Sequence, residues 1–169
     1  TSLDGTYGRC LAIGWSVGDE PSVPYADPRT ESEGDLIQNS FDSIVNALSA
    51  RQPGARGRAP FFIGHNVTFD LKFLFRRSVI LGIRPPFALP FYGRHNVEYY
   101  CTSRAWCEYG ERISLDNLCK ALGIKGKDGF DGSMVCDAWL AGEHDKIRTY
   151  CADDVRRVMQ IHRKLTLLE

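Results

Sequence analysis

The sequence predicts an α/β fold in which a mixed sheet is flanked by helices. Short apolar runs bounded by Gly and Pro alternate with longer segments of helical periodicity, which is the order of elements in an α/β sandwich. The 169 residues include 43% hydrophobic and 25% charged side chains, and these values are ordinary for one soluble globular domain. We therefore expect a single domain over residues 1–169.

The first part of the chain contains one expected strand and one long expected helix. Arg9 to Val17 is predicted to be a half-buried strand, and the proline-bearing stretch 18–30 is predicted to be a loop. Residues 31–50 are predicted to be helical because their apolar side chains recur every three or four positions: Leu36, Ile37, Phe41, Ile44, Val45 and Leu48. A Gly-, Pro- and Arg-rich connector follows at 52–60.

A strand, a helix and a second strand are expected in the middle of the chain. Phe61 to Gly64 predicts a short buried strand, and 68–81 predicts a helix. The side chains expected on the inner face of that helix are Phe69, Phe73 and Leu74. A proline-rich loop at 84–94 precedes the strand expected near 97–102.

The last third is predicted to be largely helical. Ser114 is a good N-cap for a helix that runs to about Leu122 and is closed by Gly123. After a glycine-rich charged loop, two more helices are expected, at 133–141 and 143–165.

Charge and cysteine content exclude several classes of protein. The 21 basic and 21 acidic residues cancel, which disfavours a protein that coats DNA through many phosphate contacts but allows an enzyme that holds one strand end. The six cysteines form no Cys-x-x-Cys pair, so we expect neither a zinc cluster nor a disulfide framework, and the composition favours a reducing, cytoplasmic location. No apolar stretch reaches membrane-spanning length, so no membrane partner is expected.

Two acidic segments far apart in sequence are the strongest functional signal. Tyr150 and Asp154 are four residues apart in a helical pattern, so they share one helix face with apolar neighbours. A carboxylate on such a face needs an ionic partner or a metal, and Asp70, which follows a buried strand, is the candidate companion. Two carboxylates from separate elements predict a divalent-metal site of the kind that hydrolyses phosphodiesters.

The same residues resemble known motifs. The spacing Asn66-x-x-Phe69-Asp70 resembles the second motif of the DEDD 3'-5' exonucleases, and Tyr150-x-x-x-Asp154 resembles the third motif of their tyrosine-containing branch, DEDDy. The chain is similar in particular to the predicted exonucleases related to family B DNA polymerases, through 114–123, the loop after it and the last helix. The likeness spans roughly 61–165.

The resemblance implies a ribonuclease-H-like fold and two divalent cations, Mg²⁺ or Mn²⁺, held by four carboxylates. Asp154 would then ligate the ion that activates the attacking water, and Asp70 would support the second ion. The hydroxyl of Tyr150 would orient the water. The implied reaction removes nucleoside monophosphates from the 3' end of single-stranded DNA.

Four further residues are candidates for contact with nucleic acid. His65, Asn66 and Phe69 lie beside Asp70 in sequence, and Lys127 lies in the glycine-rich loop. The expected partner is a single-stranded DNA 3' end, with RNA as the alternative substrate. The resemblance also makes a DNA polymerase or replication and repair proteins candidate partners.

The chain departs from the family at the first motif, a strand that carries Asp-x-Glu. The sequence contains no Asp-x-Glu, and the nearest substitute, Asp4, is followed two positions later by Thr6, which is not an anionic ligand. Either the first strand lies outside this sequence, which we favour because the other motif residues are intact, or the protein is a catalytically incomplete nucleic-acid-binding or scaffold module. We expect this segment alone to bind divalent metal poorly.

Each site residue also has a structural interpretation. Asp70 could be an N-cap for a helix that begins at Leu71, and Tyr150 could be a core residue with a surface hydroxyl. A salt bridge from Asp154 to Arg156 or Arg157 is not expected, because we place those residues too close in sequence to face it.

Overall fold

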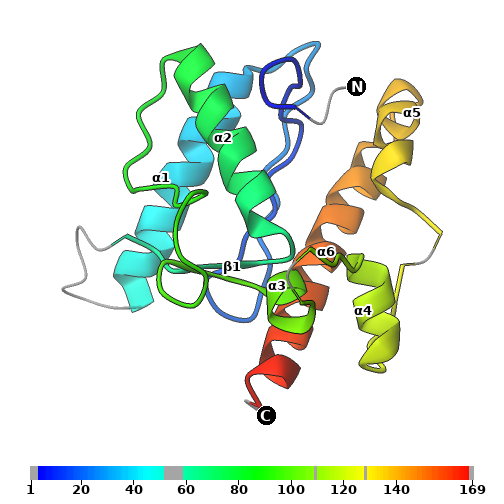
Figure 1. The fold of residues 1–169 in the computed structure, drawn as a ribbon. Helices are drawn as coiled ribbons and strands as arrows, with labels where there is room; N and C mark the ends of the chain where they lie inside the picture. The colour runs from blue at the N-terminus through cyan, green and yellow to red at the C-terminus, as the bar shows by residue number, and fades with distance from the viewer. Residues whose placement is uncertain (1–3, 52–58, 109, 128, 168–169) are drawn as a thin grey trace.

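Six α-helices and two short strands make up the described part of the chain in this computed structural model, which covers residues 4–51, 59–108, 110–127 and 129–167. Helices α1 (Glu33–Arg51) and α2 (Val67–Leu81) pack side by side on one side of the molecule (Figure 1). Helix α6 (His144–Leu165) crosses the other side, with α4 (Leu115–Ala121) and α5 (Val135–Leu140) against it.

The sheet lies between these two groups of helices. Strand β1 (Phe62–Gly64) pairs in parallel with β2 (Tyr99–Cys101), with Phe62 opposite Tyr99. Helix α2 forms the crossover between the two strands, as a parallel pair requires. The expected alternation of strands and helices is confirmed. The sheet was expected to be mixed, but among the described residues it is a parallel pair, because the antiparallel pairing of the first expected strand is limited to isolated bridges.

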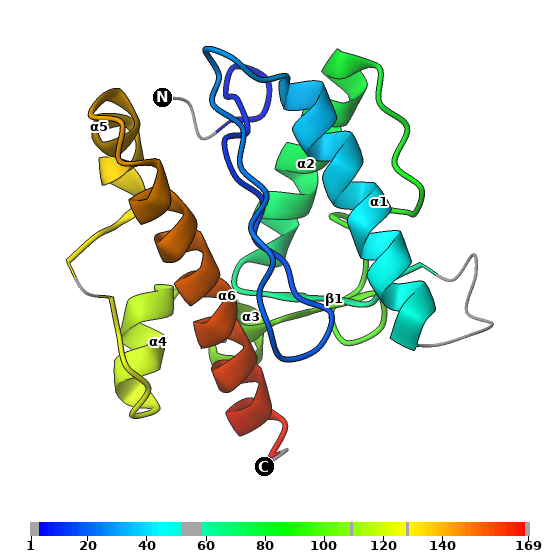
Figure 2. The same ribbon diagram turned by 180° about the vertical axis from the view of Figure 1, so that it is seen from behind.

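The expected strand at Arg9–Val17 does not form as a regular strand. Its residues make two isolated antiparallel bridges, Ala12 with Tyr25 and Trp15 with Ser22. The amide of Ile13 donates to the carbonyl of Pro24 at 3.1 Å, but proline has no N–H to return the bond, so the ladder is interrupted there. We call residues 9–26 the N-terminal hairpin; it lies between α1 and α6 (Figure 2).

The expected helices form within a few residues of their predicted bounds. The hydroxyl of Ser114 accepts a hydrogen bond from the amide of Asn117 at the start of α4, and Gly123 follows that helix with a positive φ of 66°. The helix expected at 133–141 begins as the 3₁₀ turn η1 (Gly132–Met134) and continues as α5. The short helix α3 (Thr102–Trp106) was not predicted. Most of the connector at 52–60 lies outside the described residues.

Phe69 was expected to face inward, and that expectation is wrong. Its side chain is 42% exposed, whereas Val67 and Leu71, one turn apart, are buried. Phe69 lies two positions from both, and two positions turn a helix by more than half a circle, so it points away from the core. The other two residues, Phe73 and Leu74, pack against a buried cluster of α1 and the N-terminal hairpin, as predicted.

Two close contacts fix the N-terminal hairpin to the helices. The buried carboxylate of Glu33 on α1 forms an ion pair with Arg77 on α2 at 2.7 Å. It also accepts a hydrogen bond from the backbone amide of Cys10, again at 2.7 Å. On the opposite side, Gly14 lies so close to α6 that a Cβ there would be 2.7 Å from the sulfur of Cys151. The hairpin is therefore held between the helices that carry Asp70 and Asp154.

No helix in the described ranges is both long enough and apolar enough to cross a membrane.

Candidate active site

Asp70 lies in the first turn of α2, four residues after the N-cap Asn66. The N-cap assignment to Asn66 excludes the alternative in which Asp70 itself caps a helix beginning at Leu71. An acidic side chain in the first turn is favoured by the positive end of the helix dipole. The strand β1 and the left-handed Asn66, with φ 56°, together set where α2 begins and so place Asp70 beside the N-terminal hairpin and α6.

The electrostatic environment of Asp70 is unfavourable for a negative charge. Burial, with a smaller contribution from the charge of Asp154, raises the pKa of Asp70 to about 7. The residue is nevertheless exposed by surface area, so protein surrounds the carboxyl on most sides while water still reaches it. A carboxyl in such a recess gains most when a cation binds beside it.

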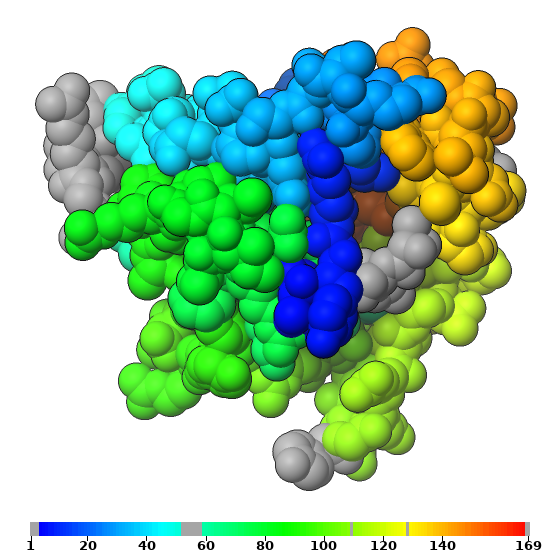
Figure 3. All heavy atoms as spheres, turned by 90° about the horizontal axis from the view of Figure 1, so that it is seen from above, coloured from blue at the N-terminus to red at the C-terminus, as the bar shows by residue number. Residues whose placement is uncertain are grey.

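Asp154 is close enough to Asp70 for their charges to interact. Its charge acts on the pKa of Asp70. The pKa of the half-buried Cys151 thiol is raised mainly by partial burial and in addition by the charges of both carboxylates. The structure therefore does not place the two carboxylates on opposite sides of the molecule. Seen from above, the N-terminal segment and α5 flank a hollow in which atoms of α6 are visible (Figure 3).

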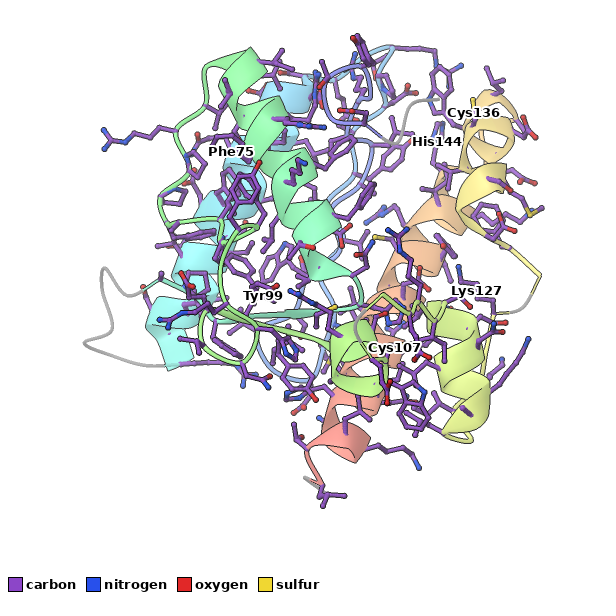
Figure 4. The ribbon with its side chains drawn as sticks, viewed as in Figure 1. Phe75, Tyr99, Cys107, Lys127, Cys136 and His144 are labelled. Carbon is purple, nitrogen blue, oxygen red and sulfur yellow. The ribbon has the colours of Figure 1, made fainter. Side chains whose placement is uncertain are left out.

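Tyr150, one turn before Asp154 on α6, is held by Lys127. The ammonium group of Lys127 donates to the Tyr150 hydroxyl at 2.9 Å and lies 4.9 Å from the centre of its ring. Phe130, from the same loop, packs edge-on against that ring, with 5.2 Å between ring centres. Figure 4 shows Lys127 beside α6. Lys127, proposed to contact nucleic acid, and Tyr150, proposed to orient water, are therefore in direct contact with each other.

The pKa values of this pair follow from burial and charge together. Burial raises the pKa of Tyr150, as does the charge of Asp154, while the hydrogen bond from Lys127 opposes the increase. For Lys127, burial alone would lower the pKa, but the bond to Tyr150 and the charges of Asp154 and Asp131 outweigh it, so its pKa is raised. We expect a neutral Tyr150 hydroxyl beside a charged Lys127 at neutral pH.

Asp154 does form a salt bridge on its own helix, contrary to the sequence-based expectation. Its carboxylate accepts a hydrogen bond from the guanidinium of Arg157 at 2.9 Å, and Arg156 pairs instead with Asp153 at 3.0 Å. The expectation was wrong because residues three apart on a helix are neighbours on its surface. Asp153 therefore has a surface partner of its own.

His65 has protein partners at both ring nitrogens. Nδ1 is 2.9 Å from the hydroxyl of Thr102, and Nε2 is 2.9 Å from the carbonyl of Ile113. Burial lowers the pKa of His65, although the charge of Asp154 opposes that change. His65 is thus near the site and links the end of β1 to the start of α3 and to the segment before α4.

Three other candidate residues, Asn66, Phe69 and Asp4, are all exposed but have different surroundings. Asn66 and Phe69 are exposed at the start of α2, beside Asp70, where a ligand can reach them. Asp4 is instead paired with Arg76 at 2.5 Å, a turn and a half beyond Asp70 on α2. The carboxylate considered as a substitute for the missing first motif is therefore occupied by an arginine.

The donor set fits one divalent cation better than two. Within the described ranges, no group of three or more His, Cys, Asp or Glu side chains is arranged to hold a metal. Mg²⁺ is often bound by one or two carboxylates together with substrate phosphate oxygens. Asp70 and Asp154 are the two carboxylates available for one such ion, whereas a second ion would need acidic ligands that these residues do not supply.

The family is decided by a comparison with known sequences. The model of a family described as predicted 3'-5' exonucleases related to the exonuclease domain of PolB matches residues 26–169. The chain belongs to this family. No curated protein matches the chain. Membership in this exonuclease family supports a nucleic acid as the substrate, and exonucleases of this kind usually use divalent metals.

Sequence reasoning rejected one part of the site and missed another. Arg157 was considered and set aside, although its i+3 spacing to Asp154 is that of neighbours on a helix surface. Asp116, which accepts the amide of Lys127 at 2.8 Å, carries no signal of this kind, because the two residues are joined by a loop whose path the sequence does not specify.

Proposed function

We propose that this protein is a metal-dependent 3'-5' exonuclease that removes nucleoside monophosphates from the 3' end of single-stranded DNA, with a ribonuclease-H-like catalytic core of the DEDDy type. The observation that carries the proposal is the electrostatic coupling of Asp70 with Asp154, next to the hydrogen-bonded pair Tyr150 and Lys127. All four residues lie within 26–169, the stretch that the family model matches.

Each side chain has a distinct role in the proposed reaction. Asp70 and Asp154 would hold a divalent cation, Mg²⁺ or Mn²⁺, which when bound would supply Lewis acidity and lower the pKa of a water molecule. The Tyr150 hydroxyl, fixed by Lys127, positions that water, and the raised pKa of Tyr150 keeps the hydroxyl protonated as a donor. Lys127 also brings a positive charge beside Tyr150, and this charge would attract a phosphate of the substrate. Asn66 and Phe69, exposed beside Asp70, contact the terminal nucleotide.

A matched pair of acids on α6 tests the proposal. The protein as its gene encodes it is incubated with Mn²⁺ and a single-stranded oligonucleotide labelled at its 5' end, and we expect a ladder of products shortened from the 3' end. Asp154→Asn should lower the rate by more than about 100-fold. Mutating a residue that only hydrogen-bonds to a metal ligand already lowers metal affinity or activity by about 10–100-fold, and this substitution would replace a ligand itself. Asp153→Asn, which removes a carboxylate paired with Arg156 at the surface, should retain the rate.

Two results would contradict the proposal. One is an Asp154→Asn variant that degrades the oligonucleotide as fast as the unsubstituted protein. The other is a product pattern that begins at the 5' end or within the strand. An RNA oligonucleotide of the same sequence, assayed in parallel, separates the exoribonuclease alternative from the DNA exonuclease.

A second candidate is a nuclease-like scaffold that binds nucleic acid without cleaving it. It is favoured by the lack of any Asp-x-Glu in the sequence and by the lack of a group of three metal-binding side chains among the described residues. Reading the gene upstream of the codon for Thr1 discriminates the two. A further apolar strand with Asp-x-Glu favours the enzyme, and its absence favours the scaffold.

A further inference from the structure

The side chain of Arg157 is buried and makes contacts in three directions. Only 9% of it is exposed, which is unusual for arginine unless its charge is paired. Its guanidinium donates to Asp154 at 2.9 Å, to the carbonyl of Gly126 at 3.0 Å and, more weakly, to the carbonyl of Lys125 at 3.4 Å. Arg157 thus joins a carboxylate on α6 to the backbone of the loop that carries Lys127.

The same loop is held on its other side by α4. Asp116 accepts the amide of Lys127 at 2.8 Å, and its second oxygen pairs with Lys120 at 2.6 Å. The loop packs so tightly there that a Cβ on Gly126 would lie 2.5 Å from Asp116. With its backbone fixed between Arg157 and Asp116, the next side chain along the loop, Lys127, is directed at Tyr150.

These contacts form a ring that begins and ends on α6. Asp154 binds Arg157, Arg157 binds the carbonyl of Gly126, the following residue Lys127 binds Tyr150, and Tyr150 stands one turn from Asp154 on α6. We propose that Arg157 is a positioning residue: it fixes the 125–127 loop on α6 and thereby sets both the orientation of Asp154 and the contact of Lys127 with Tyr150.

Arginine suits this role in a way that lysine does not. A planar guanidinium presents several N–H groups in fixed directions, so it can hold one carboxylate and two carbonyls at once, whereas an ammonium is a compact point charge. The hydrogen bond to Asp154 also leaves that residue capable of binding a cation, because ligating carboxylates are commonly held by such partners. The effect of Arg157 on cation binding by Asp154 rests on the proposed function. Its effect on the position of the 125–127 loop is independent of that function.

A double-substitution comparison isolates the coupling between Arg157 and Lys127. The reporter is the ring signal of Tyr150 in the NMR spectrum of protein carrying ¹³C-labelled tyrosine, assigned by its loss in Tyr150→Phe. When Lys127→Met is the only substitution, it should change the chemical shift of this Tyr150 signal; this change is called the displacement. In Arg157→Gln and in Arg157→Lys the displacement should fall to less than about half, because the loop no longer directs residue 127 at the ring.

Arg156→Gln is the matched control, because Arg156 is the neighbouring arginine and pairs with Asp153 at the surface. In that background Lys127→Met should displace the Tyr150 signal in full. An equal displacement in the Arg157→Lys and Arg156→Gln backgrounds would overturn the proposal. A reduced displacement in Arg157→Lys, which keeps the charge, shows that the directed hydrogen bonds are what couples the loop to the helix.

A measurement on the unsubstituted protein covers the case in which the Arg157 variants do not fold. The side-chain N–H signals of Arg157 in ¹⁵N-labelled protein, assigned through the backbone, should be separate and protected from exchange with water. A single averaged, rapidly exchanging set of signals would overturn the proposal, because a guanidinium held in three directions cannot rotate freely.

Metal binding tests the part that concerns Asp154. In the protein as its gene encodes it, Arg157→Gln should bind Mn²⁺ about 10–100-fold more weakly than Arg156→Gln, as measured by calorimetry. Equal affinities would refute a role of Arg157 in orienting Asp154. If the unsubstituted protein binds no Mn²⁺, the proposed metal chemistry fails, while the NMR comparison still decides the role of Arg157.

Discussion

At Asp70, ionisation of the carboxyl opposes folding. Burial raises the pKa of Asp70 from 3.8 to about 7, so the folded state holds this proton more tightly than the unfolded chain does. The contribution of Asp70 to the free energy of unfolding therefore falls as the pH rises from 3.8 to about 7. Asp70→Asn removes this dependence, and above pH 7 the variant should be more stable than the unsubstituted protein.

Urea unfolding across that pH range measures the effect. The curves of the two proteins should converge below the ordinary pKa of aspartate, where the carboxyl is protonated in both states. Asp35→Asn, which changes an exposed acid in the first turn of α1, is the control. In this variant the free energy of unfolding should still differ between acid and neutral pH as it does in the unsubstituted protein. If Asp70→Asn is less stable than the unsubstituted protein above pH 7, the ionised carboxylate is stabilised by a partner within the fold.

At the scale of elements, the N-terminal hairpin depends on a glycine at its contact with α6. A Cβ at Gly14 would lie 2.7 Å from the sulfur and 3.2 Å from the carbonyl oxygen of Cys151. Gly14→Ala should therefore lower the free energy of unfolding by about 1–3 kcal/mol, the usual cost of overpacking. Thermal and urea unfolding measure it.

Gly34→Ala is the control for that substitution. Gly34 lies in α1, where a new Cβ has only ordinary contacts, the nearest at 3.4 Å. Because alanine has a higher helix propensity than glycine, the Gly34→Ala variant should be as stable as the unsubstituted protein or more stable. A loss of stability at Gly34 as large as that at Gly14 would show that the close contact with α6 is not the cause.

The ion pair between Glu33 and Arg77 fastens α1 to α2 and the N-terminal hairpin. Both side chains are nearly buried, at 6% and 11% exposure, and Glu33 also accepts the amide of Cys10. Glu33→Gln leaves Arg77 with an uncompensated buried charge, so it should cost about 3–5 kcal/mol of unfolding free energy. The loss is measured by urea unfolding.

The exposed pair of Glu143 with Lys146 provides the comparison. These side chains are 46% and 54% exposed and 2.9 Å apart, so Glu143→Gln should change the stability by less than about 1 kcal/mol. If the two substitutions had equal effects, burial would not be what makes the Glu33 pair important.

For the molecule as a whole, we expect the 169-residue chain by itself to bind Mn²⁺ weakly and to degrade oligonucleotides slowly or not at all. Its described residues bring together two carboxylates, whereas the exonuclease motifs that it resembles imply four. Calorimetry and the oligonucleotide assay on this chain measure both properties. Rapid nuclease activity of the 169-residue chain would contradict this prediction and require that the missing ligands come from within it.

Much of the fold was predictable because its determinants are local. The helix expected at 31–50 forms at Glu33–Arg51, and the one expected at 68–81 forms at Val67–Leu81, since apolar periodicity acts over a few neighbouring residues. The strand expected at 9–17 failed because a strand also depends on its partner, and Pro24 cannot complete the ladder. Phe69 was misplaced because its exposure depends on where the helix begins.

The sequence by itself determined the family and the candidate acids, since the spacing of Asp70, Tyr150 and Asp154 within their elements is a property of the chain. Only the tertiary structure decided which side chains these residues meet. Asp154 meets Arg157, Tyr150 meets Lys127, and Asp4 meets Arg76. The physical reason is that electrostatic and hydrogen-bond energies depend on distances between groups, and for groups joined by loops those distances are set by packing rather than by spacing in sequence.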